Sequence, residues 1–337
     1  MKKLRFLFLT VIDLFKVKVL GKKIPLAVSW CITKRCNYRC MYCGTWKIPS
    51  QELSTSEICN IIDEMKKSGV RKITFTGGEP LLRDDIGEIV DYVHKKDILV
   101  NINSNGSLFK IKIHKLRNLD SLGLSLEGPE EVHDVLRQKG SFKDVMEAVD
   151  IAVANKIKIS FSVTLNSLNF NCIDYLLNLA KRHKTRIVFQ PSTEKLLGGE
   201  EINPVSLTAV KYSQTVNRII QYKAGEYRRI IRNSLAGLKH LSSWPNLKGI
   251  NCPGGFITCR INSDGSVFHC AKAKDRVEFP LNCIEDGFRK AFNNLSPITC
   301  SMCSCALRVE ASYILRLNLA ALMNAFLVEM SLWGKEK

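Results

Sequence analysis

Short apolar runs alternate with amphipathic stretches along the first half of the chain. Six runs are rich in β-branched and large apolar side chains and are bounded by polar or turn residues: Leu26–Cys31, Lys72–Phe75, Leu99–Asn103, Ser121–Leu126, Lys158–Thr164 and Arg186–Gln190. Runs of this length and composition are typical of strands that are buried on both faces of a parallel sheet. The pattern therefore predicts six parallel strands between Pro25 and Pro191.

The amphipathic stretches between these runs predict helices. The first, Glu52–Ser68, opens with Ser54 and Glu57 at capping-box spacing and places four apolar residues on one face: Ile58, Ile61, Ile62 and Met65. Similar stretches follow at three further places: Asp84–Lys96, Phe142–Asn155 and Cys172–His183. Six strand–helix units predict an α/β fold, a partial (β/α)6 barrel of the TIM type, with its active site at the carboxyl ends of the strands.

The composition is that of a folded protein, because 45% of the 337 residues are hydrophobic and 24% are charged. The pattern changes along the chain and divides it into five segments. They are a basic amphipathic segment at 1–24, the barrel at 25–195, a basic helical linker at 196–249, a small cysteine-rich domain at 250–307 and an apolar helix at 308–337.

Thirteen cysteines indicate metal or redox chemistry. The apolar run Phe6–Ile12 is followed by Asp13 and two lysines without a small-residue cleavage site, which argues against export. We therefore expect a cytoplasmic protein, in which clustered cysteines are metal ligands or redox groups rather than disulfides. Three cysteines at apolar strand or helix positions are expected to be core residues: Cys31, Cys59 and Cys172.

The first cysteine cluster directly follows the first predicted strand. Cys36, Cys40 and Cys43 have the spacing CxxxCxxC, so three thiolates on one loop can occupy three corners of an iron–sulfur cubane and leave the fourth iron open. An open iron suits a chelating ligand, such as the amino and carboxylate groups of a methionine moiety. The alternative is a zinc site that takes a fourth ligand from elsewhere.

This arrangement resembles the radical S-adenosylmethionine (SAM) superfamily. The resemblance implies a [4Fe–4S] cluster that binds SAM, donates one electron and cleaves it to a 5′-deoxyadenosyl radical, which abstracts a substrate hydrogen. It places Tyr42 near the adenine and identifies Gly77-Gly78-Glu79 with the family's GGEP loop, which binds the methionine amino group. Two glycines let backbone carbonyls approach a ligand closely, and Glu79 supplies a negative partner for an ammonium.

The resemblance extends to the ends of the later strands. Ser104 and Asn105 resemble the family's TNG turn, and Ser125 would contact the ribose or carboxylate of SAM. Arg137 would pair with the methionine carboxylate, for which a guanidinium fork is suited; a solvated helix residue is the alternative. The remaining expectations are that Asn166 contacts the ribose or forms a turn, that Gln190 edges the adenine, and that Glu127 contacts the substrate.

A second cysteine cluster lies in the segment 250–307. Ser263-Asp264-Gly265 predicts a hairpin turn that brings Cys252 and Cys270 to the same end. This spacing resembles the SPASM/twitch extensions of radical SAM enzymes, which implies an auxiliary [4Fe–4S] cluster. The ligands that we favour are Cys252, Cys270, Cys300 and Cys303, with Cys259 or Cys305 as substitutes. A second auxiliary cluster and a zinc ribbon stay open, because spacing alone does not separate zinc from iron.

The net charge of +18 is concentrated in two segments, 1–25 and 203–245, which carry +6 each. We do not expect nucleic acid as a partner, because the basic residues lack interleaved aromatics or a known binding module. Both chain ends are apolar, and only 12 uncharged residues separate Arg316 from Glu329, too few to span a bilayer. We expect either interfacial helices on the inner face of the membrane or terminal helices packed on the protein.

These observations predict a radical SAM enzyme that takes electrons from a small donor such as flavodoxin or ferredoxin. The apolar ends favour a lipid-linked substrate. The alternative is a peptide or protein substrate, because the SPASM-like extension resembles that of peptide maturases; a small molecule stays open. The alternative from another functional class is a non-catalytic protein that binds zinc or a cluster.

Overall fold

The structure is a computed structural model that describes residues 2–49, 51–197, 199–247, 249–272, 280–296, 298–300 and 303–331. Within these ranges it describes all side chains except those of 2–7, 299–300 and 327–331. Six parallel strands form the centre of the fold: β1 (Ala27–Thr33), β2 (Lys72–Gly77), β3 (Leu99–Ser104), β4 (Ser121–Ser125), β5 (Lys158–Leu165) and β6 (Arg186–Pro191). The predicted α/β barrel and its six strands are confirmed.

The sheet continues past β1 into the cysteine-rich segment. Its order is β6-β5-β4-β3-β2-β1-β8-β9, where β8 (Thr258–Ile261) runs parallel to β1 and β9 (Val267–Phe268) pairs antiparallel with β8. The predicted hairpin at Ser263-Asp264-Gly265 therefore exists, but it lengthens the barrel sheet. Pairing with β8 gives the backbone N–H and C=O groups at this edge of β1 their hydrogen-bond partners.

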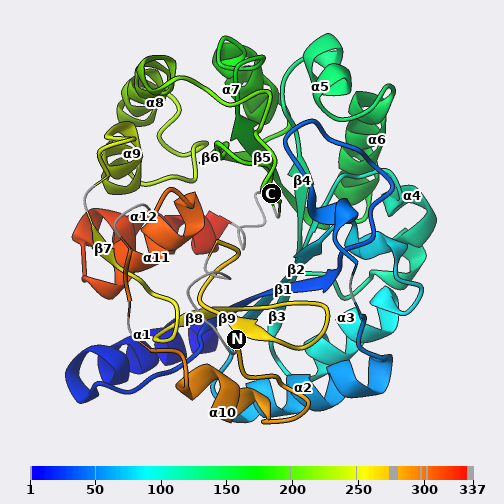
Figure 1. The fold of residues 1–337 in the computed structure, drawn as a ribbon, viewed down its shortest axis with the longest axis vertical. Helices are drawn as coiled ribbons and strands as arrows, with labels where there is room; N and C mark the ends of the chain where they lie inside the picture. The colour runs from blue at the N-terminus through cyan, green and yellow to red at the C-terminus, as the bar shows by residue number, and fades with distance from the viewer. Residues whose placement is uncertain are drawn as a thin grey trace.

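Helices cover the outer side of this curved sheet (Figure 1). They are α2 (Thr55–Lys67), α3 (Ile86–Lys95), α4 (Phe109–Lys112), α5 (Glu130–Leu136), α6 (Ser141–Ala154) and α7 (Ile173–Arg182), with short 3-10 helices at Thr45–Lys47, Pro80–Leu82 and Ile113–Lys115. The predicted capping box of α2 is present, since the Ser54 side chain accepts from Glu57 N and the Glu57 carboxylate accepts from Ser54 N. Its four apolar residues are all buried against the sheet.

Most of the second half of the chain lies at the open side of the sheet, whereas its helix α10 lies beside α2 (Figure 1). Its elements are α8 (Ala209–Ala224), α9 (Leu235–Ser242), β7 (Ile250–Asn251), α10 (Phe288–Asn293), β10 (Thr299–Cys300), α11 (Ala306–Leu315) and α12 (Leu319–Ser331). Lys223 Nζ donates to Asn324 Oδ1 at 2.8 Å, and Asn324 Nδ2 donates to the carbonyl of Arg232 at 2.7 Å. These bonds attach α12 to α8 and the loop after it, so the C-terminal helix packs on the protein.

The N-terminal helix α1 (Lys2–Leu20) packs at the amino end of β1. Its Val17 is buried together with Leu26 and Ile257, the residues that immediately precede β1 and β8. No helix in the described ranges is long and apolar enough to cross a membrane.

Candidate active site at the carboxyl ends of the strands

The loop that carries Cys36, Cys40 and Cys43 lies over the carboxyl end of β1, and all three side chains are half-buried. Segments far apart in the sequence hold this loop. Met41 N donates to the carbonyl of Leu136, the last residue of α5, at 2.9 Å, and Leu197 N donates to the carbonyl of Tyr42 at 3.1 Å. The three cysteines are therefore presented from a fixed backbone.

Burial favours the neutral form of the Cys36 and Cys40 thiols. Burial raises the pKa of Cys36, and it raises the pKa of Cys40 to about 11 against the opposing charge of Arg137. Such thiols ionise when they bind metal, because the metal supplies the charge that the pocket lacks. Among the described side chains, no three of Cys, His, Asp and Glu converge on a single-ion position. Three thiolates on one loop are the ligand set that a cubane with one open iron would take.

The two glycines after β2 let this cysteine loop approach closely. A Cβ on Gly77 would lie 2.0 Å from the carbonyl oxygen of Thr33, and one on Gly78 would lie 2.1 Å from that of Arg35. The backbone amides of Gly78 and Glu79 donate to these two carbonyls, each at 2.8 Å. Sequence reasoning assigned the glycines to ligand approach and missed this contact between the two loops.

Glu79 is fully buried and joins the ends of β2 and β3. Its carboxylate accepts from Leu81 N at 3.0 Å, Ser104 Oγ at 2.9 Å and Asn105 N at 2.8 Å. Burial raises its pKa, and these hydrogen bonds oppose that effect. Asn105 Nδ2 also donates to Asn37 Oδ1 in the cysteine loop at 2.9 Å. The structure thus brings three predicted residues together beside the cysteines, and their contact with SAM stays a prediction.

Tyr42, Glu127 and Arg137 form a buried cluster next to Cys40. Tyr42 Oη donates to Glu127 Oε1 at 2.6 Å, and Arg137 Nη2 donates to both Tyr42 Oη at 2.6 Å and Glu127 Oε1 at 2.9 Å. The other carboxylate oxygen of Glu127 accepts from Thr164 N at 3.0 Å. Glu127 has no exposed surface. Its geometry is that of a residue that orients Arg137 and Tyr42, and its contact with substrate stays a prediction.

Three other predicted residues lie at the ends of β4, β5 and β6. Ser125 is half-buried at the end of β4. Asn166 is fully buried, and its side chain accepts from Leu168 N at 3.0 Å and donates to the carbonyl of Thr164 at 2.8 Å. These bonds are those of a turn-forming asparagine. The ribose and adenine contacts expected of Asn166 and Gln190 stay predictions.

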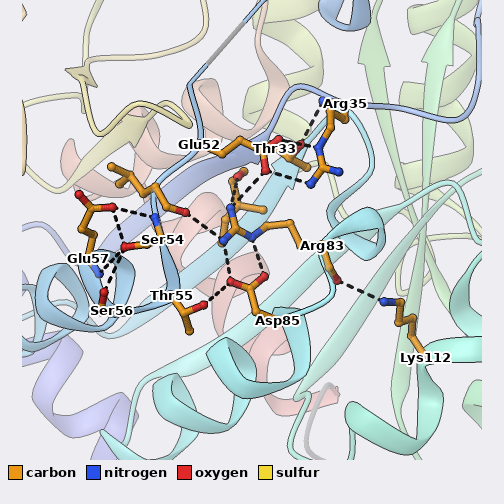
Figure 2. Close-up of polar contacts among 12 residues, drawn as sticks. Thr33, Arg35, Glu52, Ser54, Thr55, Ser56, Glu57, Arg83, Asp85 and Lys112 are labelled. Atoms are coloured by element: carbon orange, nitrogen blue, oxygen red, sulfur yellow. Dashed lines mark hydrogen bonds and ion pairs between the residues drawn. The ribbon is translucent and has the colours of Figure 1, made fainter.

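Figure 2 shows a polar network behind the cysteine loop, which sequence reasoning did not find. Glu52 accepts from Arg35 Nε at 2.8 Å and from Arg83 Nη1 at 3.4 Å. Arg83 also donates to both oxygens of Asp85, at 2.8 and 2.6 Å, and to the carbonyl of Leu53 at 3.0 Å. The network fixes the start of the cysteine loop against the GGEP loop. In the sequence, the main indication of this network is the pair of acidic residues directly after Arg83.

Comparison with known proteins agrees with this geometry. The model of the radical SAM superfamily matches residues 30–180. A GTP 3′,8-cyclase of Campylobacter jejuni is 32% identical over 232 residues, which cover 61% of this chain and 72% of the cyclase. The chain belongs to the radical SAM superfamily. As a radical SAM enzyme it uses a [4Fe–4S] cluster and SAM.

Two further similarities extend beyond the barrel of this radical SAM enzyme. The mycofactocin maturase MftC of Mycolicibacterium smegmatis is 28% identical over 275 residues, which cover 79% of this chain and 69% of MftC. The structure of Streptococcus suis SuiB bound to S-adenosylmethionine has a TM-score of 0.68 at 15% identity and covers 83% of this chain and 68% of SuiB. The likeness to SuiB shows a shared fold.

The auxiliary cysteines of the radical SAM enzyme lie on neighbouring backbone segments. Cys252 N donates to the carbonyl of Ile298 at 3.0 Å, and Cys300 pairs with Ile250 across β7 and β10. A Cβ on Gly254 would lie 2.8 Å from the Cβ of His269, so the Cys252 segment also meets the residue before Cys270. The side chain of Cys300 lies outside the described part of the structure.

The candidate ligands Cys259, Cys303 and Cys305 differ in burial. Cys259 has no exposed surface on β8 and belongs to the hydrophobic core together with Cys283. Burial raises the pKa of Cys259 to about 12. Cys303 is buried, and Cys305 is half-buried at the start of α11. Which of these thiols bind the auxiliary cluster stays a prediction.

Gln190 connects this region to the barrel. Its Nε2 donates to the carbonyl of Ser304 at 3.0 Å, and its Oε1 accepts from Ala306 N at 2.9 Å. Both hydrogen-bonding groups of the amide therefore hold the segment between Cys303 and α11. Sequence reasoning gave Gln190 an adenine contact and missed this connection.

Proposed function

We propose that this radical SAM enzyme modifies a peptide substrate. The observation that carries the proposal is the extent of the similarity to the maturase MftC, which covers 79% of this chain. The superfamily match to residues 30–180 accounts for the barrel alone, so the similarity to MftC reaches the cysteine-rich segment as well. SuiB, whose fold this chain shares, has also been solved bound to its precursor peptide SuiA. These similarities favour a peptide over the lipid-linked substrate that the apolar ends suggested.

The residues of the site have distinct parts in this function. The cluster, held by Cys36, Cys40 and Cys43, and SAM would together supply the one-electron chemistry that activates a substrate C–H bond. Arg137, fixed by Glu127 and Tyr42, offers a guanidinium for the carboxylate of SAM. The half-buried thiol loop would keep a bound cofactor partly shielded from water, which limits side reactions.

Transfer of deuterium from the substrate into 5′-deoxyadenosine tests the proposal. Cells of the source organism are grown in deuterated medium and separated into a peptide, a lipid and a small-molecule fraction. Each fraction is incubated anaerobically with the purified enzyme, unlabelled SAM and reductant, and the 5′-deoxyadenosine is analysed by mass spectrometry. We expect deuterium from the peptide fraction, with loss of the label after protease treatment. Deuterium from only the lipid or small-molecule fraction contradicts a peptide substrate.

A further inference from the structure

Helix α1 presents an exposed apolar stripe. Phe8, Val11, Phe15 and Val19 are each 60–65% exposed. Their spacing of three, four and four residues places them within roughly 80° of one another on a helix that turns by about 100° per residue. Single exposed apolar residues are ordinary on protein surfaces, but four large ones on one helix face form a contiguous patch. Figure 1 shows α1 in dark blue at the edge of the molecule.

The opposite face of α1 holds the helix in this orientation. The buried Val17 and the partly buried Leu14 pack in a small core with Ala311 and Leu315 of α11. Asp13, only 4% exposed, accepts from Arg71 Nε at 3.2 Å and Nη2 at 2.8 Å. An ion pair that makes two hydrogen bonds to a buried carboxylate fixes the rotation of the helix. The apolar stripe consequently points away from the protein.

Lysines border the stripe on both sides. At the same rotation per residue, Lys16 and Lys18 fall roughly 80° to either side of Phe8. Lys18 and Lys22 are exposed, and residues 1–25 together carry a net charge of +6. An apolar face with aromatic residues and flanking lysines is typical of helices that lie in the interface of an anionic membrane, with the lysine ammonium groups at the headgroups. The core of a protein interface, by contrast, is depleted of lysine.

We propose that α1 docks this enzyme in the plane of an anionic membrane surface, with Phe8, Val11, Phe15 and Val19 entering the headgroup boundary. The helix joins the amino end of β1, whereas the cysteine loop lies at the carboxyl end. In this orientation the active site faces the aqueous side, where it receives its substrate from solution. Membrane docking thus anchors the protein without presenting lipid to the cluster.

Vesicle flotation of the full-length protein tests the docking surface. The vesicles consist of phosphatidylcholine alone or mixed with phosphatidylglycerol. We expect flotation with the mixed vesicles, weakened by added salt. The double variant Phe8→Ser/Phe15→Ser should bind at least about tenfold more weakly. The variant Lys18→Glu/Lys22→Glu should lose the preference for phosphatidylglycerol. The matched control Ile111→Ser/Val135→Ser, which changes two equally exposed apolar residues, should float like the wild type.

Folding and self-association are measured on the same proteins. Circular dichroism and the rate of SAM cleavage should be unchanged in Phe8→Ser/Phe15→Ser, because the stripe faces away from the core and the site. Absence of wild-type flotation with either kind of vesicle overturns the proposal. So does equal flotation of the wild type and the double variant. A wild-type dimer that this variant dissociates, without vesicle binding, would assign the stripe to a second copy of the chain.

Discussion

Gly78 lies in direct contact with the backbone of Arg35, the residue before the first cysteine of the cluster loop. A Cβ at Gly78 would be 2.1 Å from the carbonyl oxygen of Arg35 and 2.6 Å from that of Lys34. Both neighbours are backbone atoms, so neither can rotate out of the way. The cysteine loop can therefore take its position only if the GGEP loop keeps this shape.

Gly78→Ala should therefore displace the cysteine loop and lower the iron content of the protein. We expect destabilisation by about 1–3 kcal/mol or more, as is usual for overpacking. Iron per chain and the thermal unfolding midpoint after anaerobic purification are the measurements. Gly199→Ala is the control, because its Cβ would meet only the Leu196 side chain at 3.9 Å. Wild-type iron content in Gly78→Ala would contradict the packing role.

The ionisation of Glu52 should make the stability of the fold depend on pH in the acid range. Burial acts to raise its pKa, but hydrogen bonds from Arg35 and Thr33 outweigh burial and leave the pKa below its ordinary value of 4.5. A carboxylate with a lowered folded pKa stabilises the protein above the unfolded value, and this stability is lost as pH falls through the folded value. Glu52→Gln should thus destabilise the protein at neutral pH by about 1–3 kcal/mol and by less below pH 4.5.

Urea unfolding of wild type and variant at a series of pH values measures this difference. Exposed Glu285→Gln serves as the control and should follow the wild type throughout. A loss of stability in Glu52→Gln that stays constant from neutral to acid pH would show that the carboxylate charge is not responsible.

The Tyr42 hydroxyl holds Arg137 and Glu127 in one arrangement. Tyr42→Phe removes a hydrogen bond to charged groups, which is typically worth about 1.5–3 kcal/mol. If Arg137 binds the carboxylate of SAM, the dissociation constant of SAM should rise by roughly 10- to 100-fold. Equilibrium dialysis with the reconstituted protein measures it, and the partly exposed Tyr175→Phe is the control. Unchanged SAM affinity in Tyr42→Phe would argue against this role of Arg137.

The Gln190 amide holds the chain between Cys303 and α11 through Ser304 and Ala306. Gln190→Ala should release this segment and lower the iron content by up to about four atoms per chain, the content of one auxiliary cluster. Because the cysteine loop is held separately, the cluster that binds SAM should persist. Iron analysis with Mössbauer or EPR spectroscopy distinguishes the two clusters. The exposed Gln221→Ala is the control, and full iron content in Gln190→Ala would contradict the prediction.

The sequence predicts those parts of the molecule that depend on local pattern. The buried strands and α2 follow from apolar runs and a capping box, and spacing alone marks Cys36, Cys40 and Cys43. The pairing of β1 with β8 joins residues about 230 positions apart, and no periodicity in the sequence predicts it. The bonds of Gln190 to Ser304 and of Glu52 to Arg83 are likewise side-chain contacts set by tertiary packing. Motif position assigned Gln190 and the glycines to ligand contacts, which stay predictions, but it gave no indication of their contacts with the protein.

The most direct test of the account is reductive SAM cleavage measured together with metal content. Anaerobically purified wild type should hold about eight irons, four for each of two clusters, and should form 5′-deoxyadenosine with SAM and reductant. Cys40→Ala should lose about four irons and all SAM cleavage. Cys59→Ala, a change on α2, should keep the wild-type iron content and the wild-type rate of SAM cleavage. Zinc in place of iron, or 5′-deoxyadenosine formed by Cys40→Ala at the wild-type rate, would contradict the assignment of the cysteine loop.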